Sequence, residues 1–274
     1  MLLDLTHLEP AHIDAKLPDI TEFARTYLGI EPYTEPVPVY PTAHYAMGGV
    51  PTTIDGEVLR TNTAVVAGLF AAGETACVSV HGANRLGTNS LLDIIVFGRR
   101  SGIAAAAHAR DAGWRDLPED PAGAVVARLD ALREAPPGEK VADVRRELQE
   151  TMDANAQVFR TEESLTAALA DIAALRARFE AVSVQDKGAR FNTDLLEAVE
   201  LGFLIDLAEV VVAGALRRRE SRGGHFREDF PDRDDAAFME HTMAYRRTTE
   251  DGPTVRLDTK PVTMTRYQPM ERKY

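Results

Sequence analysis

The sequence predicts an α/β region, followed by an all-α region similar to a three-helix bundle and by a small β-containing tail. Two observations lead to this prediction. Short apolar runs bounded by glycines fill the chain through Gly102, which is typical of strands and tight turns. Beyond Trp114, apolar residues recur at helical spacing in three long stretches. We place the three regions at residues 1–112, 113–225 and 226–274.

Strand-like segments alternate with glycine turns in the first region. Residues 51–56 predict a strand followed by a turn, and residues 64–67 and 69–72 predict short strands. From residue 89 the pattern changes to that of a helix, for which Asn89 or Ser90 is the predicted N-cap. A helix therefore begins where a glycine-rich segment ends.

Prolines and a capping residue predict the helix limits in the second region. Pro118 and Pro121 indicate one helix start, and residues 136–138 indicate a break before the next helix. Thr161 is a predicted N-cap, and residues 217–219 are predicted at a helix end. The predicted apolar stripes of the three long helices are Val141, Val144, Leu148 and Met152; Leu165, Leu169, Ile172, Leu175, Phe179 and Val182; and Leu196, Val199, Phe203, Leu207 and Val210.

The tail begins where the last long helix is predicted to stop, at residues 221–225. Residues 230–235 predict a polar loop, and residues 254–257 and 262–265 predict strands.

The composition argues against several classes of function. The net charge is −12, from 31 Lys and Arg against 43 Asp and Glu, so we expect no nucleic-acid partner. No apolar run approaches the roughly 20 residues that span a bilayer, so we expect no membrane span in this chain. Cys77 is the single cysteine and cannot form an internal disulfide, which fits the cytosol. We also expect no metal site, because no histidines show metal-ligand spacing.

Three candidate cofactor-binding residues lie at the end of a strand and at the start of a helix. Glu74 ends an apolar run, where a carboxylate can accept hydrogen bonds from ligand hydroxyls. Ser90 and Leu91 begin the helix, where backbone N–H groups suit an anion or an electron-rich ring such as a flavin. Purely structural readings remain open, since Glu74 can be an exposed strand end and Ser90 can simply cap its helix.

Two further candidates, His44 and Arg85, suit a small dicarboxylate. Arg85 lies among glycines and small residues, and its planar guanidinium matches a carboxylate bidentately. His44 supplies a donor and a charge that changes near neutral pH. The alternative for His44, and more strongly for His81, is a loop histidine with its hydrogen bonds satisfied.

Taken together, these segments resemble the flavoprotein subunit of succinate dehydrogenase and fumarate reductase. The resemblance covers nearly the whole chain. It rests on PTAHYAMGGVPT (residues 41–52), GLFAAGE (68–74), VSVHGANRLG (78–87), NSLLD (89–93), VFGR (96–99), SRGGH (221–225) and REDFPDRDD (227–235).

The resemblance implies a fold, a cofactor and a set of roles. Residues 1–112 would be the C-terminal portion of a Rossmann-like FAD-binding domain. His44 and Arg85 would bind succinate or fumarate, Glu74 would hold the ribityl part of FAD, and Ser90 and Leu91 would present backbone amides to the flavin ring. Succinate would be oxidised to fumarate by hydride transfer to FAD. Electrons would pass to an iron–sulfur subunit and a quinone, with membrane anchor subunits holding the complex on the cytoplasmic, inner face of the plasma membrane.

The sequence also departs from this family. No Gly-x-Gly-x-x-Gly is present for the FAD pyrophosphate, and the covalent-flavin histidine, the capping domain and its proton-relay arginine have no counterparts. We therefore expect the C-terminal part of a longer subunit, inactive alone, with no catalytic proton-transfer residue of its own. Two alternatives stay open: an L-aspartate oxidase-like flavoenzyme, which shares a related His-Tyr-x-x-Gly-Gly and Gly-Ala-Asn-Arg pattern, and a non-catalytic remnant or interaction module.

Overall fold

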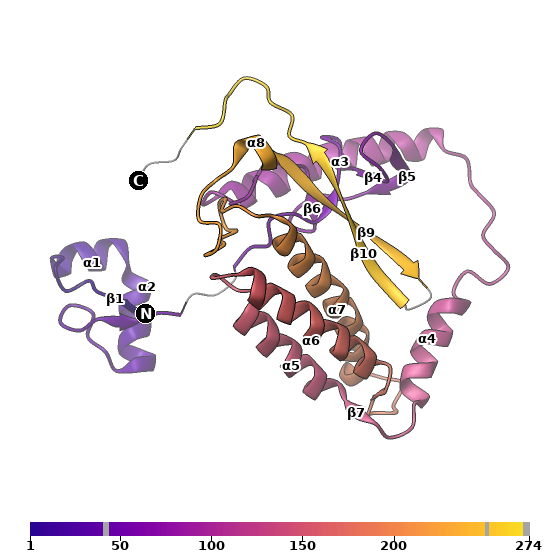
Figure 1. Cartoon of the computed structure of the whole chain (residues 1–274), viewed down its shortest axis with the longest axis horizontal. Coiled ribbons are helices and arrows are strands. Elements are labelled where there is room, and N and C mark those ends of the chain that lie inside the picture. The colour runs from indigo at the N-terminus through magenta and orange to yellow at the C-terminus, as the bar shows by residue number, and fades with distance from the viewer. Residues whose placement is uncertain (41–43, 250–251, 271–274) are drawn as a thin grey trace. The chain divides into compact units, whose positions relative to one another are not determined.

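The computed structural model describes residues 1–40, 44–249 and 252–270, and it divides the chain into two compact units, Met1–Ala46 and Met47–Tyr274 (Figure 1). Residues 41–43 of the predicted PTAHYAMGGVPT motif lie outside the described residues. The predicted region boundaries after residues 112 and 225 stay a prediction.

The first unit is a small helical unit closed by a two-stranded pairing. Its elements are β1 (Leu2–Leu3), α1 (Pro10–Lys16), α2 (Pro18–Phe23), the π-helical turn η1 (Ala24–Leu28) and β2 (Val37–Pro38). β1 pairs antiparallel with β2. A proline at the first helical position begins both α1 and α2, because its fixed φ suits a helix start. Ile13 and Ala24 are buried and form part of the unit's small core.

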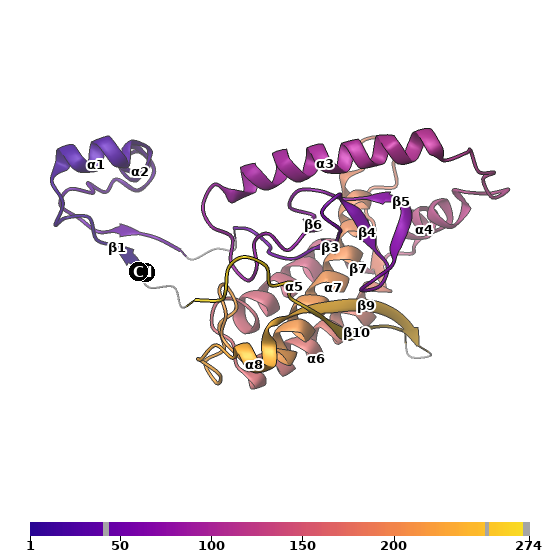
Figure 2. The ribbon, with the colours of Figure 1, turned by 90° about the horizontal axis from the view of Figure 1, so that it is seen from above.

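The second unit contains, in chain order, β3 (Val50–Pro51), β4 (Glu57–Leu59), β5 (Val65–Phe70), β6 (Ala76–Cys77), α3 (Asn89–Asp111), α4 (Gly123–Glu134), β7 (Glu139–Lys140), α5 (Val141–Asn155), α6 (Glu162–Phe179), β8 (Val182–Ser183), α7 (Thr193–Arg217), α8 (Asp235–Phe238), β9 (Glu240–Thr249) and β10 (Gly252–Pro261). β3 pairs with β6 in parallel, and β4 pairs with β5 antiparallel. The two short strands predicted on either side of Gly68 are one strand, β5, which continues through Gly68 at φ +82. Helix α3 contacts β5, and Figure 2 shows it running along these strands.

Helices α5, α6 and α7 pack around the main hydrophobic core of this unit (Figure 1). Thr161 is the N-cap of α6, as predicted, and forms a reciprocal capping box with Ser164. The core residues include Val144, Leu148, Leu165, Ile172, Leu175, Leu201, Ile205 and Val212. The predicted stripes of α5 and α6 therefore face the core, and Val182 does so from β8 rather than from α6.

The predicted stripe of α7 is wrong in part. Leu196, Phe203 and Leu207 are 56%, 52% and 59% exposed. The buried stripe instead comprises Ala198, Leu201, Ile205, Ala208, Val212 and Ala215. Apolar residues cover nearly all faces of α7, so spacing alone does not select one stripe. The alanine-containing stripe is the one that faces the core.

The predicted strands of the tail are also corrected. β9 and β10 form one antiparallel hairpin, in which the pairing joins Thr254 to Arg247 and Leu257 to Ala244. The predicted strand 254–257 lies inside β10, whereas residues 262–265 are not a strand and β9 was missed. The hairpin contacts α7. The length of the hairpin therefore depends on strand pairing and on packing against α7, which a local apolar run does not encode.

A histidine fixes the chain just after α7. His225 Nδ1 lies 3.0 Å from Arg160 Nη1, and its Nε2 lies 3.0 Å from the carbonyl oxygen of Arg218. The guanidinium can only donate and the carbonyl can only accept, so the neutral tautomer with a proton on Nε2 fits both contacts. Burial lowers the pKa of His225, and the charges of Arg160, Arg218 and Arg227 add to that effect.

Because of that lowered pKa, we expect the free energy of unfolding to fall as the pH drops below about 6.5, the ordinary histidine value. Below this pH the unfolded chain binds a proton that the folded chain does not. Denaturant unfolding measured across this range, with His225→Gln, tests the prediction. Glutamine keeps one donor and one acceptor but does not bind a proton in this range. The pH dependence of the free energy of unfolding should therefore shrink.

The remaining pH dependence should come partly from His241, whose pKa burial also lowers. The exposed His12 gives the matched control, and His12→Gln should leave the profile as it is. A His225→Gln profile identical to that of the native chain would contradict the assignment.

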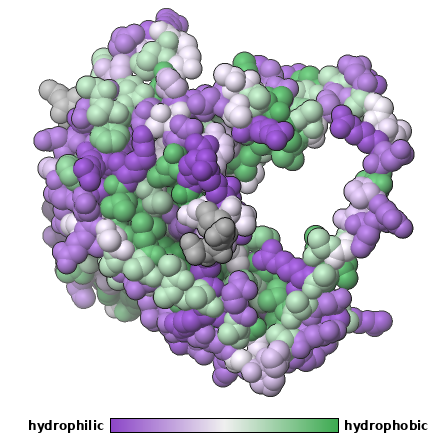
Figure 3. Space-filling view, turned by 45° about the vertical axis from the view of Figure 1, so that its right-hand side comes forward, coloured by the Kyte–Doolittle hydropathy of each residue, from purple (hydrophilic) through white to green (hydrophobic). Residues whose placement is uncertain are grey.

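Large apolar side chains are exposed along α3. They are Leu91, Leu92, Ile94, Ile95, Val96 and Ile103. Figure 3 shows hydrophobic residues gathered at several places on one face of the molecule. Apolar patches of this kind mark interaction surfaces. None of the helices in the described ranges has both the length and the apolar character that crossing a membrane requires.

Candidate functional site

Arg85 lies in an irregular loop, residues 78–88, which connects β6 to α3. It is half-buried. Ser79 and Thr88, near the two ends of this loop, adopt φ values of +75° and +68°. Such left-handed backbone is uncommon for residues other than glycine and persists only where the surroundings hold it. The contacts of the loop therefore determine where Arg85 lies.

A histidine–aspartate pair holds this loop on α3. His81 Nε2 lies 3.0 Å from Asp93 Oδ2, and the two side chains are only 10% and 4% exposed. Asp93 belongs to the second turn of α3. The pair therefore connects the loop that carries Arg85 with the helix that carries Ser90 and Leu91.

Glu74 lies in a tight segment against the same helix. Gly73 has φ +80°, and a Cβ there would lie 3.3 Å from Ile94 Cγ2 of α3. On the other side, the backbone N–H of Val50 donates to the Thr75 carbonyl at 2.8 Å, and a Cβ on Gly49 would lie 2.4 Å from that oxygen. Only glycine permits this approach. The exposed Glu74 thus lies between the Gly48–Gly49 segment and α3.

The start of α3 differs from the prediction. Thr88 precedes the helix, and no side chain caps it, so the predicted cap by Asn89 or Ser90 is wrong. Ser90 Oγ is buried and has no hydrogen-bond partner among the residues that the structure describes. Leu91 is 60% exposed. An uncapped helix start with an unsatisfied hydroxyl can donate hydrogen bonds to a ligand.

The structure brings together the segments that carry four of the five predicted residues. Glu74, Arg85, Ser90 and Leu91 lie on segments that meet at the first two turns of α3. His44 is exposed and belongs to the first unit, so its pairing with Arg85 stays a prediction.

Sequence reasoning missed three contacts of the Arg85 loop. The first is the bond from His81 to Asp93, and the second is a hydrogen bond at 2.9 Å from the Gly224 N–H to the carbonyl of Ala83. In the third, Ser79 Oγ lies 3.3 Å from His241 Nε2. The segments containing Asp93 and Gly224 were noted in the sequence, but no spacing pointed to these contacts.

Comparisons with known proteins identify the family. A family model for an FAD binding domain matches residues 1–91, and the model "Fumarate reductase flavoprotein C-term" matches residues 145–274. The succinate dehydrogenase flavoprotein subunit of Rickettsia conorii is 44% identical over 270 residues, which cover 97% of this chain and 45% of that protein. Over nearly its whole length the chain is similar to flavoprotein subunits of succinate dehydrogenase and fumarate reductase. The predicted resemblance is confirmed.

Two further proteins of this flavoprotein family are similar to this chain over nearly its whole length. The fumarate reductase flavoprotein subunit of Mycobacterium tuberculosis is 44% identical over 99% of this chain and 46% of its own length. A solved quinol fumarate reductase of E. coli has a TM-score of 0.88 and 40% identity, over 98% of this chain and 45% of that chain. The chain therefore spans less than half the length of the relatives that it matches, and its fold is that of an FAD-binding flavoprotein with a C-terminal domain.

FAD as the cofactor is confirmed at the level of this flavoprotein family by the match over residues 1–91. The site fits such a group, because the buried Ser90 hydroxyl at the uncapped start of α3 has no hydrogen-bond partner among the described residues. The N–H groups of Asn89 and Leu91 already donate to the carbonyls of Leu86 and Thr88. Within the described ranges, no group of three or more His, Cys, Asp or Glu side chains could hold a metal ion.

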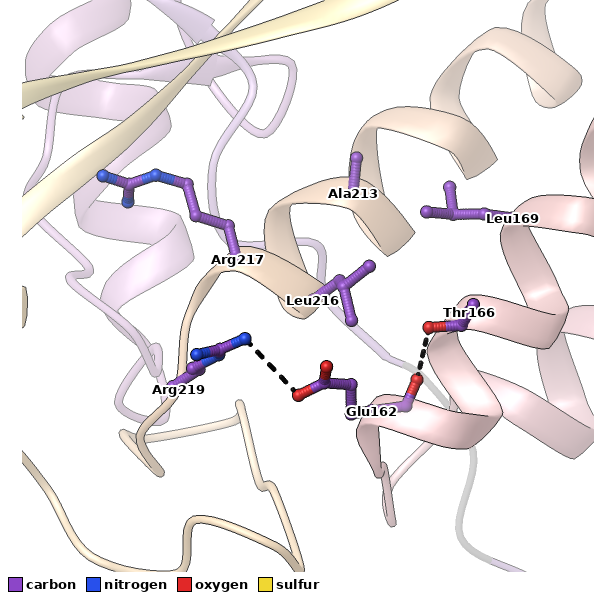
Figure 4. Close-up of a pocket in the computed structure, with 7 residues that line it drawn as sticks. All are labelled: Glu162, Thr166, Leu169, Ala213, Leu216, Arg217 and Arg219. Atoms are coloured by element: carbon purple, nitrogen blue, oxygen red, sulfur yellow. Dashed lines mark hydrogen bonds and ion pairs between the residues drawn. The ribbon is translucent and has the colours of Figure 1, made fainter.

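A separate cavity of about 500 Å³ lies between α6 and the end of α7 (Figure 4). Its lining residues are Glu162, Thr166, Leu169, Ala213, Leu216, Arg217 and Arg219. Arg219 Nη2 lies 3.6 Å from Glu162 Oε2, and Arg217 Nη2 lies 2.9 Å from Glu240 Oε1. Both arginines already have acidic partners, and none of the predicted site residues lines this cavity.

Proposed function

We propose that this chain forms part of the flavoprotein subunit of a succinate:quinone oxidoreductase, which oxidises succinate to fumarate. The observation that supports it is the uncapped start of α3, with its buried Ser90 hydroxyl, packed against the segments that carry Glu74 and Arg85. These segments lie within the FAD-binding match.

Each predicted residue then has a chemical role. The guanidinium of Arg85 binds one carboxylate of the substrate through two parallel hydrogen bonds, and His44 donates a further hydrogen bond. Glu74 accepts hydrogen bonds from ribityl hydroxyls. The backbone amide of Ser90 donates to the ring edge, where the dipole of α3 favours negative charge. The amide of Leu91 donates to the Thr88 carbonyl at 3.0 Å in this structure, so it would exchange that bond for one to the ring. FAD, when bound, would accept a hydride from one methylene carbon of succinate, and a base outside this chain would take the proton from the other.

The larger assembly follows from the same proposal. Electrons pass to an iron–sulfur subunit and a quinone, and anchor subunits hold the complex on the inner face of the plasma membrane. Solved neighbours include a quinol-fumarate reductase with menaquinol and a Mycobacterium smegmatis Sdh1 complex with UQ1, which supports this reading. The parallel pairing of β3 with β6 further suggests a Rossmann-like sheet to which both strands contribute.

The test is flavin binding followed by turnover. The chain is purified alone and also co-expressed with the N-terminal portion of the 44% identical Mycobacterium tuberculosis relative, and absorbance spectra are recorded with FAD. Succinate-dependent dye reduction is then measured. Flavin uptake and turnover in the mixture are expected. Absence of both, from chains shown to be folded, would favour the remnant or interaction-module alternative.

Replacement of Glu74 by alanine should weaken FAD retention. Hydrogen bonds to a charged group contribute about 1.5–3 kcal/mol, so the dissociation constant should rise at least about tenfold. The flavin content of the co-expressed protein after gel filtration measures this effect. Glu119→Ala, in an exposed loop, is the control and should retain FAD as the native chain does. Equal flavin content in both variants would refute the role of Glu74.

A further inference from the structure

A turn that follows α7 reaches the loop that carries Arg85. The turn consists of residues 222–225, in which the backbone N–H of Arg222 donates to the His225 carbonyl at 2.8 Å and that of His225 donates to the Arg222 carbonyl at 3.0 Å. These two bonds close the turn into a small ring. It presents Gly223 and Gly224 at its tip.

Buried charge holds the base of this turn. Glu220 is fully buried and accepts hydrogen bonds from Arg218 at 2.6 Å and from Arg222 at 2.8 and 2.9 Å. The backbone N–H of Asp234 donates to the same carboxylate at 2.9 Å. Because a buried carboxylate with this many donors has few alternative positions, it fixes the arginines that flank the turn.

The side chain of His225 holds the turn from a second direction. It joins Arg160, which itself donates to the carbonyls of Ala156 and Gln157 at the end of α5. The turn is therefore connected to α5 and to the end of α7. Its position follows that of the helical core rather than that of the Arg85 loop.

The tip of the turn contacts the Arg85 loop at close range. The Gly224 N–H donates to the Ala83 carbonyl at 2.9 Å, two residues before Arg85. Gly223 has φ +59°, and a Cβ there would lie 2.5 Å from the Ala83 oxygen and 2.6 Å from its carbonyl carbon. No side chain fits between these two backbones.

We propose that Gly223 is a positioning residue for Arg85: the close backbone contact between the 222–225 turn and Ala83 sets the place of the substrate-binding arginine. The region matched by "Fumarate reductase flavoprotein C-term" thereby shapes a site within the FAD-binding match. The His81–Asp93 pair holds the same loop on α3, so the loop is fixed from two sides. The inference rests on the proposed function only for the ligand that Arg85 binds.

Gly223→Ala tests the contact without any need for activity. Hydrogen exchange of this chain is followed in peptides from the Arg85 loop, residues 79–88, and from α6. The loop peptides should exchange at least about tenfold faster in Gly223→Ala, while the α6 peptides stay native-like. Gly224→Ala is the matched control, because Gly224 has no positive φ and a Cβ there would meet mainly the flexible end of Met47, at 3.2 Å. It should leave the loop protected.

Two further variants keep the test informative. Gly223→Asn tolerates the left-handed φ but still places a Cβ against Ala83, so it should behave like Gly223→Ala. Glu220→Gln is the variant to use if Gly223→Ala loses protection in α6 as well. It loosens the turn without adding a heavy atom, so exchange in the loop should rise while α6 stays protected. Native exchange in the loop of a folded Gly223→Ala, Gly223→Asn or Glu220→Gln variant would overturn the proposal.

The second readout is kinetic and uses the co-expressed flavoprotein. Gly223→Ala should raise the KM for succinate about tenfold with normal flavin content, since Arg85 is displaced rather than removed. If the native co-expressed flavoprotein shows no succinate turnover, the proposed function is contradicted. The hydrogen-exchange result then still decides whether Gly223 positions Arg85. Native activity together with an unchanged KM and unchanged exchange in Gly223→Ala would overturn the inference while leaving the proposed function in place.

Discussion

Replacement of Arg85 by lysine is expected to lower succinate-dependent kcat/KM about 100-fold while the flavin content stays unchanged. A lysine keeps the positive charge but loses the planar fork that grips a carboxylate through two hydrogen bonds. The loop that carries Arg85 is also held by His81 and by Ala83, so we expect the loop to keep its place in the lysine variant. Dye reduction and the absorbance spectrum of the co-expressed flavoprotein give both quantities.

Arg100→Lys is the matched control for this prediction. Arg100 is also an arginine of the second unit, but its guanidinium binds the Ile54 carbonyl at 2.8 Å and the Asp55 carboxylate at 2.7 Å. The turn that contains Ile54 and Asp55 carries none of the predicted site residues. Succinate turnover of Arg100→Lys should therefore stay near that of the native protein. Near-native turnover in Arg85→Lys as well would refute the role assigned to Arg85.

The helices could be predicted from the sequence because their signals are local. Thr161 and the acidic residues after it specify the start of α6, and the apolar spacing of Leu165, Ile172 and Leu175 specifies its buried face. The buried face of α7 could not be predicted, because that helix is apolar on nearly every side. Strand β9 was missed because its pairing with β10 and its contact with α7, rather than local alternation, hold it in place.

The candidate site could also be predicted only in part. Glu74, Arg85 and Ser90 are close in sequence and were found from glycines, charge and a helix start. The contacts that fix their positions are not local in this sense: Asp93 reaches back to His81, and Gly224 reaches Ala83 from far along the chain. The first contact follows from how the loop packs against α3, and the second from how the turn after α7 packs against the loop. Residue spacing records neither.

Replacement of Arg227 by alanine should destabilise this chain by about 3 kcal/mol, since it removes the fully buried partner of an ion pair whose other partner, Asp229, is 28% exposed. The side chain is fully buried and makes two hydrogen bonds of 2.7 Å to the carboxylate of Asp229. It also donates to the carbonyls of Ala215 and Leu216, at 3.1 and 3.2 Å, which lie in the last turn of α7. Alanine would leave both carbonyls and the carboxylate without these donors. Denaturant unfolding followed by circular dichroism measures the loss.

Arg219→Ala is the control, because Arg219 is 60% exposed and its ion pair with Glu162 is long, at 3.6 Å. Its effect should be within about 0.5 kcal/mol. The pH dependence provides an independent check. The Arg227 hydrogen bonds hold the pKa of Asp229 at about 2, below its ordinary value of 3.8. This contribution is present above pH 3.8 and is lost as the pH falls through 2. The stability difference between the native chain and Arg227→Ala should therefore narrow over that interval, and the part that comes from the two carbonyls should remain. A stability difference that stays constant through it would mean that the Arg227–Asp229 pair is not what stabilises the end of α7.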